Sequence, residues 1–155
     1  LPHAPNFTPI GALALFGGAY FSKRTALALP ILAMLASDFL IGFYEVKIML
    51  SVYASFMLSS ALGFWLRKNQ KWPRILGLSF LSAVLFFLVT NFAVWAFSPW
   101  YSKTFSGLLQ SYLMGLPFFK ATLLGNMFFA SCFFGAYKLI NLLLKKQSEV
   151  VLSSK

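Results

Sequence analysis

The sequence predicts an all-α integral membrane protein, and three observations lead to this fold class. The 155 residues are 59% hydrophobic and 19% aromatic, with a mean hydropathy of +0.77. Only three residues are acidic, and a soluble domain of this length could not cover its surface with so little charge. The apolar residues also fall into runs close to the length of a membrane-spanning helix, which is about 20 residues.

Five apolar segments are predicted to span the membrane as one transmembrane domain. Basic, polar or proline-containing stretches separate them and set their boundaries. The predicted spans are residues 10–22, 25–44, 48–66, 75–97 and 119–144. Residues 1–9 hold three prolines and are predicted to form an outer loop, and residues 145–155 are predicted to form a cytoplasmic tail.

The apolar residues 105–118 are predicted not to span. The basic clusters at residues 23–24, 67–74 and 145–146 are expected on the cytoplasmic side, because cytoplasmic loops carry an excess of Lys and Arg. The sides of successive spans must alternate, and no crossing is then left for residues 105–118. We expect a short re-entrant or interfacial helix on the outer side that folds back at Pro117. One helix before Leu1 would raise the count to six spans.

Polar side chains inside the apolar segments are the candidate site residues. Asp38, Asn91 and Asn126 lie in three different spans, each toward the outer side. Polar groups are costly in hydrocarbon and often functional, although Asn and Asp also hold membrane helices together. Their common depth favours an outward-opening pocket with aromatic walls. The other residues expected to line it are His3, Asn6, Phe86, Thr90, Trp95 and Tyr112.

Small residues recur at helical spacing in the first span, at Gly11, Ala14 and Gly18. Small side chains let a second helix backbone approach closely. The neighbouring helix could belong to this chain, or it could belong to a partner membrane protein. The spacing predicts a close contact without separating internal packing from partner docking.

The sequence lacks the residues that most catalytic and cofactor sites require. It has one His and three acids, no Gly-rich phosphate loop and no paired Cys or His at metal-binding spacing. We therefore expect no enzyme activity, no metal and no cofactor. The net charge of +10 lies at the ends of apolar segments and not on one face with aromatic residues, so no nucleic-acid partner is expected.

Several short motifs carry a resemblance to a known family. They are Pro2-His3-Ala4-Pro5-Asn6-Phe7-Thr8-Pro9-Ile10, Ala12 to Phe21, Ser37-Asp38, Ile41-Gly42-Phe43, Thr90-Asn91-Phe92 with Trp95, Leu116-Pro117-Phe118-Phe119 and Gly125-Asn126. The chain resembles a family of uncharacterised small bacterial membrane proteins described as transport proteins. That family is distantly similar to the substrate-capture subunits (S components) of energy-coupling-factor (ECF) transporters. The resemblance implies six membrane helices, an outer pocket capped by loops, and a partner module of a membrane coupling protein and two ATPases.

Two functions from different classes follow as expectations. The first is a substrate-binding membrane subunit that captures a vitamin-like small molecule on the outer side of a bacterial inner membrane. Its partners would be the lipid bilayer, a coupling protein and separate ATPases. The alternative is a structural accessory subunit of a large respiratory or photosynthetic complex. A pocket that binds a small molecule favours the first function, and a closed, internally paired polar cluster favours the second.

Overall fold

The computed structural model describes residues 7–153, and all regular structure in that range is α-helical. The five helices are α1 (Ile10–Tyr20), α2 (Lys23–Ile41), α3 (Val46–Phe64), α4 (Trp72–Phe97) and α5 (Phe105–Ser153). Helices α2 to α5 are long and apolar enough to cross a membrane, and α1 is a shorter apolar helix. The predicted all-α fold class is confirmed, and the chain is an integral membrane protein.

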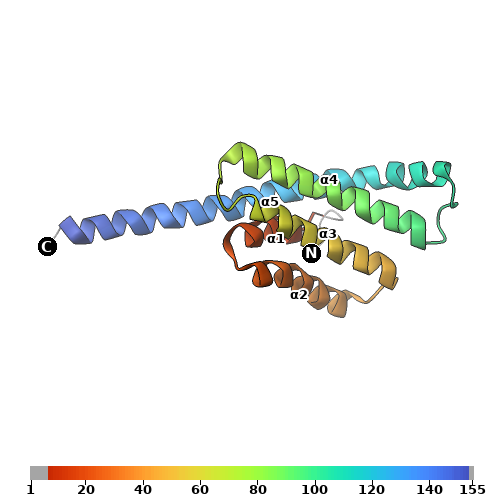
Figure 1. Cartoon of the computed structure of the whole chain (residues 1–155), viewed down its shortest axis with the longest axis horizontal. Coiled ribbons are helices and arrows are strands. Elements are labelled where there is room, and N and C mark those ends of the chain that lie inside the picture. The colour runs from red at the N-terminus through yellow and green to blue at the C-terminus, as the bar shows by residue number, and fades with distance from the viewer. Residues whose placement is uncertain (1–6, 154–155) are drawn as a thin grey trace.

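The helices form one bundle in which the short helix α1 lies among the others (Figure 1). Helix α1 packs against α2, α3, α4 and α5, α3 packs against α4, and α4 packs against the part of α5 that lies within the bundle. Large apolar side chains such as Phe39, Leu40 and Leu124 are 79%, 83% and 62% exposed, as expected of faces that contact lipid.

Most basic residues gather at one end of the bundle, which we call the basic end. Arg67 ties that end together, because its guanidinium donates to the carbonyl oxygens of Gly18 (2.9 Å) and Phe21 (2.7 Å) at the end of α1. Lys138 of α5 donates to the Gln70 carbonyl oxygen at 2.7 Å and lies over the Trp72 ring. The opposite end, which we call the far end, contains the α2–α3 and α4–α5 connections.

Helices α1 and α3 cross at two glycines. A Cβ atom added to Gly18 would collide with the Ser60 carbonyl oxygen, and one added to Gly63 would collide with the Leu15 carbonyl oxygen. The two backbones therefore touch directly, as small residues allow in membrane bundles. Ser60 adds a bond from its hydroxyl to the Ala26 carbonyl oxygen (2.8 Å), which joins α3 to α2.

The core lies in the half of the bundle that contains α1. Leu15, Leu66, Ile75 and Phe134 are each fully buried there and come from α1, the α3–α4 connection, α4 and α5. Phe16 of α1 packs on Phe134 with ring centroids 5.2 Å apart. This core fixes α1 between the long helices and closes the bundle at its basic end.

The predicted separate helix over residues 105–118 is wrong. These residues form the first part of α5, and α5 continues through Pro117 to Ser153. Neighbouring groups can compensate for a proline inside a membrane helix, and here the stretch before Pro117 packs on α4: Tyr112 donates to the Leu88 carbonyl oxygen and Ser111 to that of Asn91. At 49 residues α5 is about 74 Å long, and Figure 1 shows it projecting far beyond the bundle at the basic end.

The other predicted spans agree with helices except at the start of the chain. Residues 25–44, 48–66 and 75–97 correspond to α2, α3 and α4 within three residues at each boundary. The first predicted span, residues 10–22, is an 11-residue helix of about 16 Å, too short to cross about 30 Å of hydrocarbon. Of the predicted outer loop, half-buried Phe7 packs on the Phe129 ring of α5, Thr8 lines a cavity described below, and Pro9 is exposed. Residues 1–6 are outside the described range.

Candidate functional site

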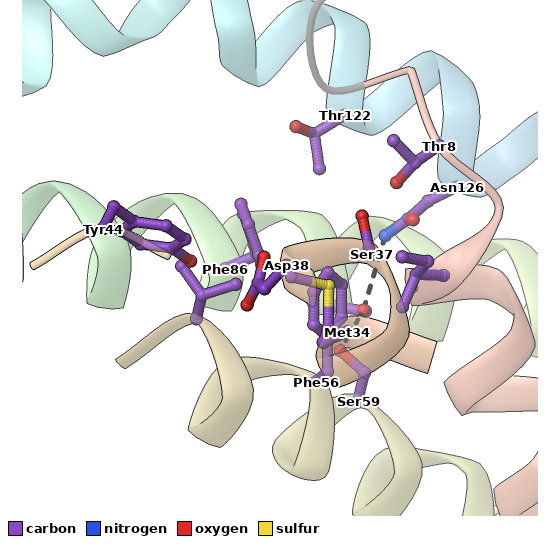
Figure 2. Close-up of a pocket in the computed structure, with 14 residues that line it drawn as sticks. Thr8, Met34, Ser37, Asp38, Tyr44, Phe56, Ser59, Phe86, Thr122 and Asn126 are labelled. Atoms are coloured by element: carbon purple, nitrogen blue, oxygen red, sulfur yellow. Dashed lines mark hydrogen bonds between the residues drawn. The ribbon is translucent and has the colours of Figure 1, made fainter. Parts of the chain in front are cut away.

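A cavity of about 250 Å³ lies at the N-terminal end of α1, in the space that this short helix leaves between the long helices. All five helices contribute to its wall, and Figure 2 shows the side chains that converge on it. The lining residues are Thr8, Ile10, Gly11, Met34, Ser37, Asp38, Tyr44, Val52, Phe56, Ser59, Ser82, Phe86, Thr122 and Asn126.

One side of the cavity carries a chain of hydrogen bonds across three helices. The Asn126 amide of α5 donates to the Ser82 hydroxyl of α4 at 3.4 Å, and Ser82 bonds to the Ser59 hydroxyl of α3 at 2.7 Å. All three side chains are at least 96% buried. The Ser59 hydroxyl also bonds the Ser55 carbonyl oxygen at 3.0 Å. This network fixes the relative positions of α3, α4 and α5 at the middle of the bundle.

The start of α1 forms the floor of the cavity. The first N–H groups of any helix lack partners within the helix, and Pro9 at the N-cap supplies no side-chain acceptor. Gly11 lies so close to the Asn126 side chain that a Cβ atom would collide with its amide oxygen. The N-terminal end of α1, which is the positive end of its helix dipole, therefore adjoins the polar part of the cavity that contains Asn126.

The other side of the cavity carries Asp38, in the last turn of α2. Helix α2 ends one turn later at Gly42, whose φ of 114° is a conformation that glycine adopts readily. The Tyr53 hydroxyl of α3 donates to Asp38 Oδ2 at 2.5 Å, and Asp38 is 5% exposed. Partial burial and, secondly, the Asp38 carboxylate raise the pKa of the Tyr44 phenol above its ordinary value.

Apolar side chains complete the walls. Phe56 of α3 and Phe86 of α4 pack against each other with ring centroids 5.1 Å apart, and Met34 and Val52 lie beside them. Val52 and Phe86 also line a second hollow of about 340 Å³ toward the far end, between α3 and the first part of α5. The cavity therefore has two polar sides within an apolar frame, a pattern typical of small-molecule sites.

The structure brings together three of the nine residues predicted to bind substrate. Asp38, Phe86 and Asn126 all line the cavity. Thr90 and Asn91 line the second hollow, and both side chains donate to carbonyl oxygens of their own helix, those of Phe86 and Phe87.

The remaining predicted residues lie elsewhere. Trp95 donates to the Ser102 carbonyl oxygen in the α4–α5 connection, and Tyr112 donates to that of Leu88. Neither residue lines the cavity. His3 and Asn6 lie outside the described residues.

The small residues of α1 are occupied within the chain. Gly11 abuts Asn126, Gly18 abuts Ser60, and Ala14 is fully buried. These contacts agree with the first alternative, in which the small residues pack against helices of the same chain. Docking of a partner through these three residues stays a prediction, and they present no exposed surface for it.

Sequence reasoning missed the serines of the site and two of its aromatic residues, Tyr44 and Phe56. Ser59 and Ser82 escape notice because a serine in a membrane helix can bond its own helix, as Ser79 does to the Ile75 carbonyl oxygen. The available signal was the spacing Ser55, Ser59 and Gly63, a small-residue pattern that marks a helix contact face.

Gly11→Ala is expected to lower the free energy of unfolding by about 1–3 kcal/mol, because the new methyl group would displace the Asn126 amide and break its bond to Ser82. Unfolding by SDS in mixed micelles measures the change. Gly77→Ala is the matched control, since a Cβ there meets nothing within 4 Å, and it is expected to be neutral or stabilising by up to about 1 kcal/mol.

A double variant tests whether the amide is the cause. If it is, Gly11→Ala should cost much less in an Asn126→Ala background than alone. Equal stability of the Gly11→Ala and Gly77→Ala proteins would contradict the observed contact.

The sequence model of a protein family, described as a family of unknown function, matches residues 1–150 of the chain. No curated protein matches the chain, and no solved structure matches it.

Proposed function

The chain belongs to DUF6580, a family of unknown function. We propose that it is a membrane subunit that captures a small molecule in the cavity at the start of α1. The observation that carries this proposal is a cavity lined by polar groups at the middle of an apolar helical bundle. Polar groups inside a membrane protein that surround unfilled space are the usual signature of a substrate site.

The size and composition of the cavity support a metabolite as the occupant. Its volume of about 250 Å³ is just below the range of roughly 300–1,000 Å³ typical of sites for drug-sized ligands. Hydroxyl, amide and carboxylate groups from four different helices point to recognition by hydrogen bonds. Phe56 and Phe86 offer apolar contact to the rest of the molecule.

The charge distribution supports capture from outside the cell. The positive-inside rule assigns the basic end to the cytoplasm. Helix α1 and the core around Phe134 then lie between the cavity and the cytoplasm, and the cavity faces the outer half of the membrane. With this orientation the C-terminal part of α5 would be cytoplasmic, and the membrane would be a bacterial inner membrane.

Uptake would need a partner, as in the ECF transporters whose S components the chain resembles. The sequence contains no phosphate-binding loop, so separate ATPase subunits and a membrane coupling protein would supply the energy. The resemblance to S components is part of this proposal.

Two tryptophan substitutions on adjacent residues test the proposal. Met34 lines the cavity, whereas Leu35 is 41% exposed on the outer surface of α2. The wild-type chain and the Met34→Trp and Leu35→Trp variants would be purified from native membranes into lipid nanodiscs, and their bound small molecules identified by mass spectrometry. We expect a metabolite in the wild type and in Leu35→Trp, and at least tenfold less of it in Met34→Trp, because the indole fills the cavity.

The outcomes separate capture from a structural role. Melting curves of the three proteins establish that each is folded. Absence of any enriched metabolite, or equal amounts in all three proteins, would overturn the proposal. Stoichiometric recovery of the chain in a respiratory or photosynthetic complex, with an empty cavity, would support the accessory-subunit alternative.

A further inference from the structure

Asp38 is a buried carboxylate with an incomplete set of partners. It is 5% exposed, and only one of its oxygens, Oδ2, accepts a hydrogen bond within residues 7–153, from Tyr53. Over the same residues the one ion pair is between Lys145 and Glu149 on the exposed end of α5, so no described Lys or Arg pairs with Asp38. The second oxygen, Oδ1, has no hydrogen-bond donor among these residues, and Asp38 lines the cavity.

A carboxylate in this position favours a positive partner. Ionised side chains inside a membrane protein are costly unless they pair or are hydrogen-bonded, and one bond from a neutral phenol compensates only part of that cost. Because Asp38 lines the cavity, a cation bound in the cavity could reach Oδ1. Figure 2 shows Asp38 next to Tyr44 and Phe86 at one side of the cavity, away from Asn126.

We propose that the ligand of this cavity is a small organic cation, a protonated primary or secondary amine that donates an N–H to Asp38 Oδ1. This inference rests on the proposed capture function and names its substrate class. Tyr44, Phe56 and Phe86 fit the same class, since the faces of aromatic rings attract cations that have left water. The cavity volume of about 250 Å³ limits the amine to the size of a small metabolite.

A set of probes that share one frame and differ in charge tests the substrate class. The benzyl frame gives benzylammonium, benzyl alcohol and benzoate, and the butyl frame gives n-butylammonium, 1-butanol and butyrate. Thermal shifts and calorimetric titrations of the full chain in nanodiscs measure binding. We expect the two ammonium probes to bind the wild type at least tenfold more tightly than the alcohols, and the carboxylates to bind least.

The variant Asp38→Asn removes the charge and keeps an acceptor for the Tyr53 hydroxyl. We expect it to weaken ammonium binding by about 10- to 100-fold and to leave alcohol binding within about threefold. The melting temperature of the unliganded variant reports whether it is folded. The folded Met34→Trp variant measures partitioning of the probes into lipid, because its cavity is filled.

The outcomes distinguish failure of the substrate class from failure of capture. Alcohols binding as well as amines, benzoate binding best at the start of α1, or full amine binding by folded Asp38→Asn would overturn the amine assignment. In each of these cases loss of binding in Met34→Trp would leave capture standing. If no probe binds and no metabolite copurifies with the wild type, both proposals fail.

Discussion

Gly63→Leu is expected to lower the free energy of unfolding by about 3 kcal/mol or more. The Cβ of residue 63 would overlap the Leu15 carbonyl oxygen and press on the Gly18 Cα, so both colliding groups belong to the backbone of α1. A flexible side chain could rotate away, but a helix backbone can only shift as a unit. Such a shift would also disturb the Arg67 bonds to the end of α1.

The measurement is reversible unfolding in mixed micelles, followed by fluorescence or by hydrogen exchange of α1. Gly77→Leu is the matched control, because it places the same side chain on α4 where nothing lies within 4 Å of the Cβ, and it is expected to be neutral or stabilising by up to about 1 kcal/mol. Equal stability of the Gly63→Leu and Gly77→Leu proteins would show that α1 and α3 do not cross at these glycines.

Phe134→Ala is expected to cost about 2–4 kcal/mol. The Phe134 ring is fully buried and packs edge-on against Phe16 (5.2 Å) and at a tilt against Tyr20 (5.7 Å). Unfolded helices of a membrane protein stay in apolar surroundings, so the loss comes from packing contacts and the cavity that remains. The effect therefore measures how tightly α1 is held between the long helices.

Phe80→Ala provides the comparison for this substitution. Phe80 lies on α4 and is 49% exposed toward the surroundings of the bundle, so its removal is expected to change stability by less than about 1 kcal/mol. Both variants are measured under the same SDS titration. A cost at position 134 no greater than at position 80 would contradict the core described above.

The helices were largely predictable because the signal for a membrane helix is local. Apolar run length and the charges between runs locate α2, α3 and α4 without knowledge of the fold. The error at Pro117 arose because the effect of a proline depends on its neighbours, and the contacts of Tyr112 and Ser111 with α4 join residues more than 19 positions apart. No local pattern contains that information.

The polar part of the site was predictable only where its residues are unusual in an apolar segment. Asp38 and Asn126 stand out for that reason, and both line the cavity. Asn91 stands out equally, but its amide bonds the Phe87 carbonyl oxygen and it lies in the neighbouring hollow. Which polar residues face each other depends on the rotation of each helix, and that rotation is set by contacts such as Gly18 with Gly63.

The shortness of α1 has a consequence for how the protein is made. A helix of 11 residues whose first N–H groups lie at the depth of Asn126 would leave those groups unbonded in lipid if it entered the bilayer alone. The long helices can insert one by one, but α1 becomes stable only once α3 and α5 offer their glycine and asparagine contacts. The contacts that hold α1 come from α3 and α5, so the floor of the cavity is expected to form only after those helices are in place.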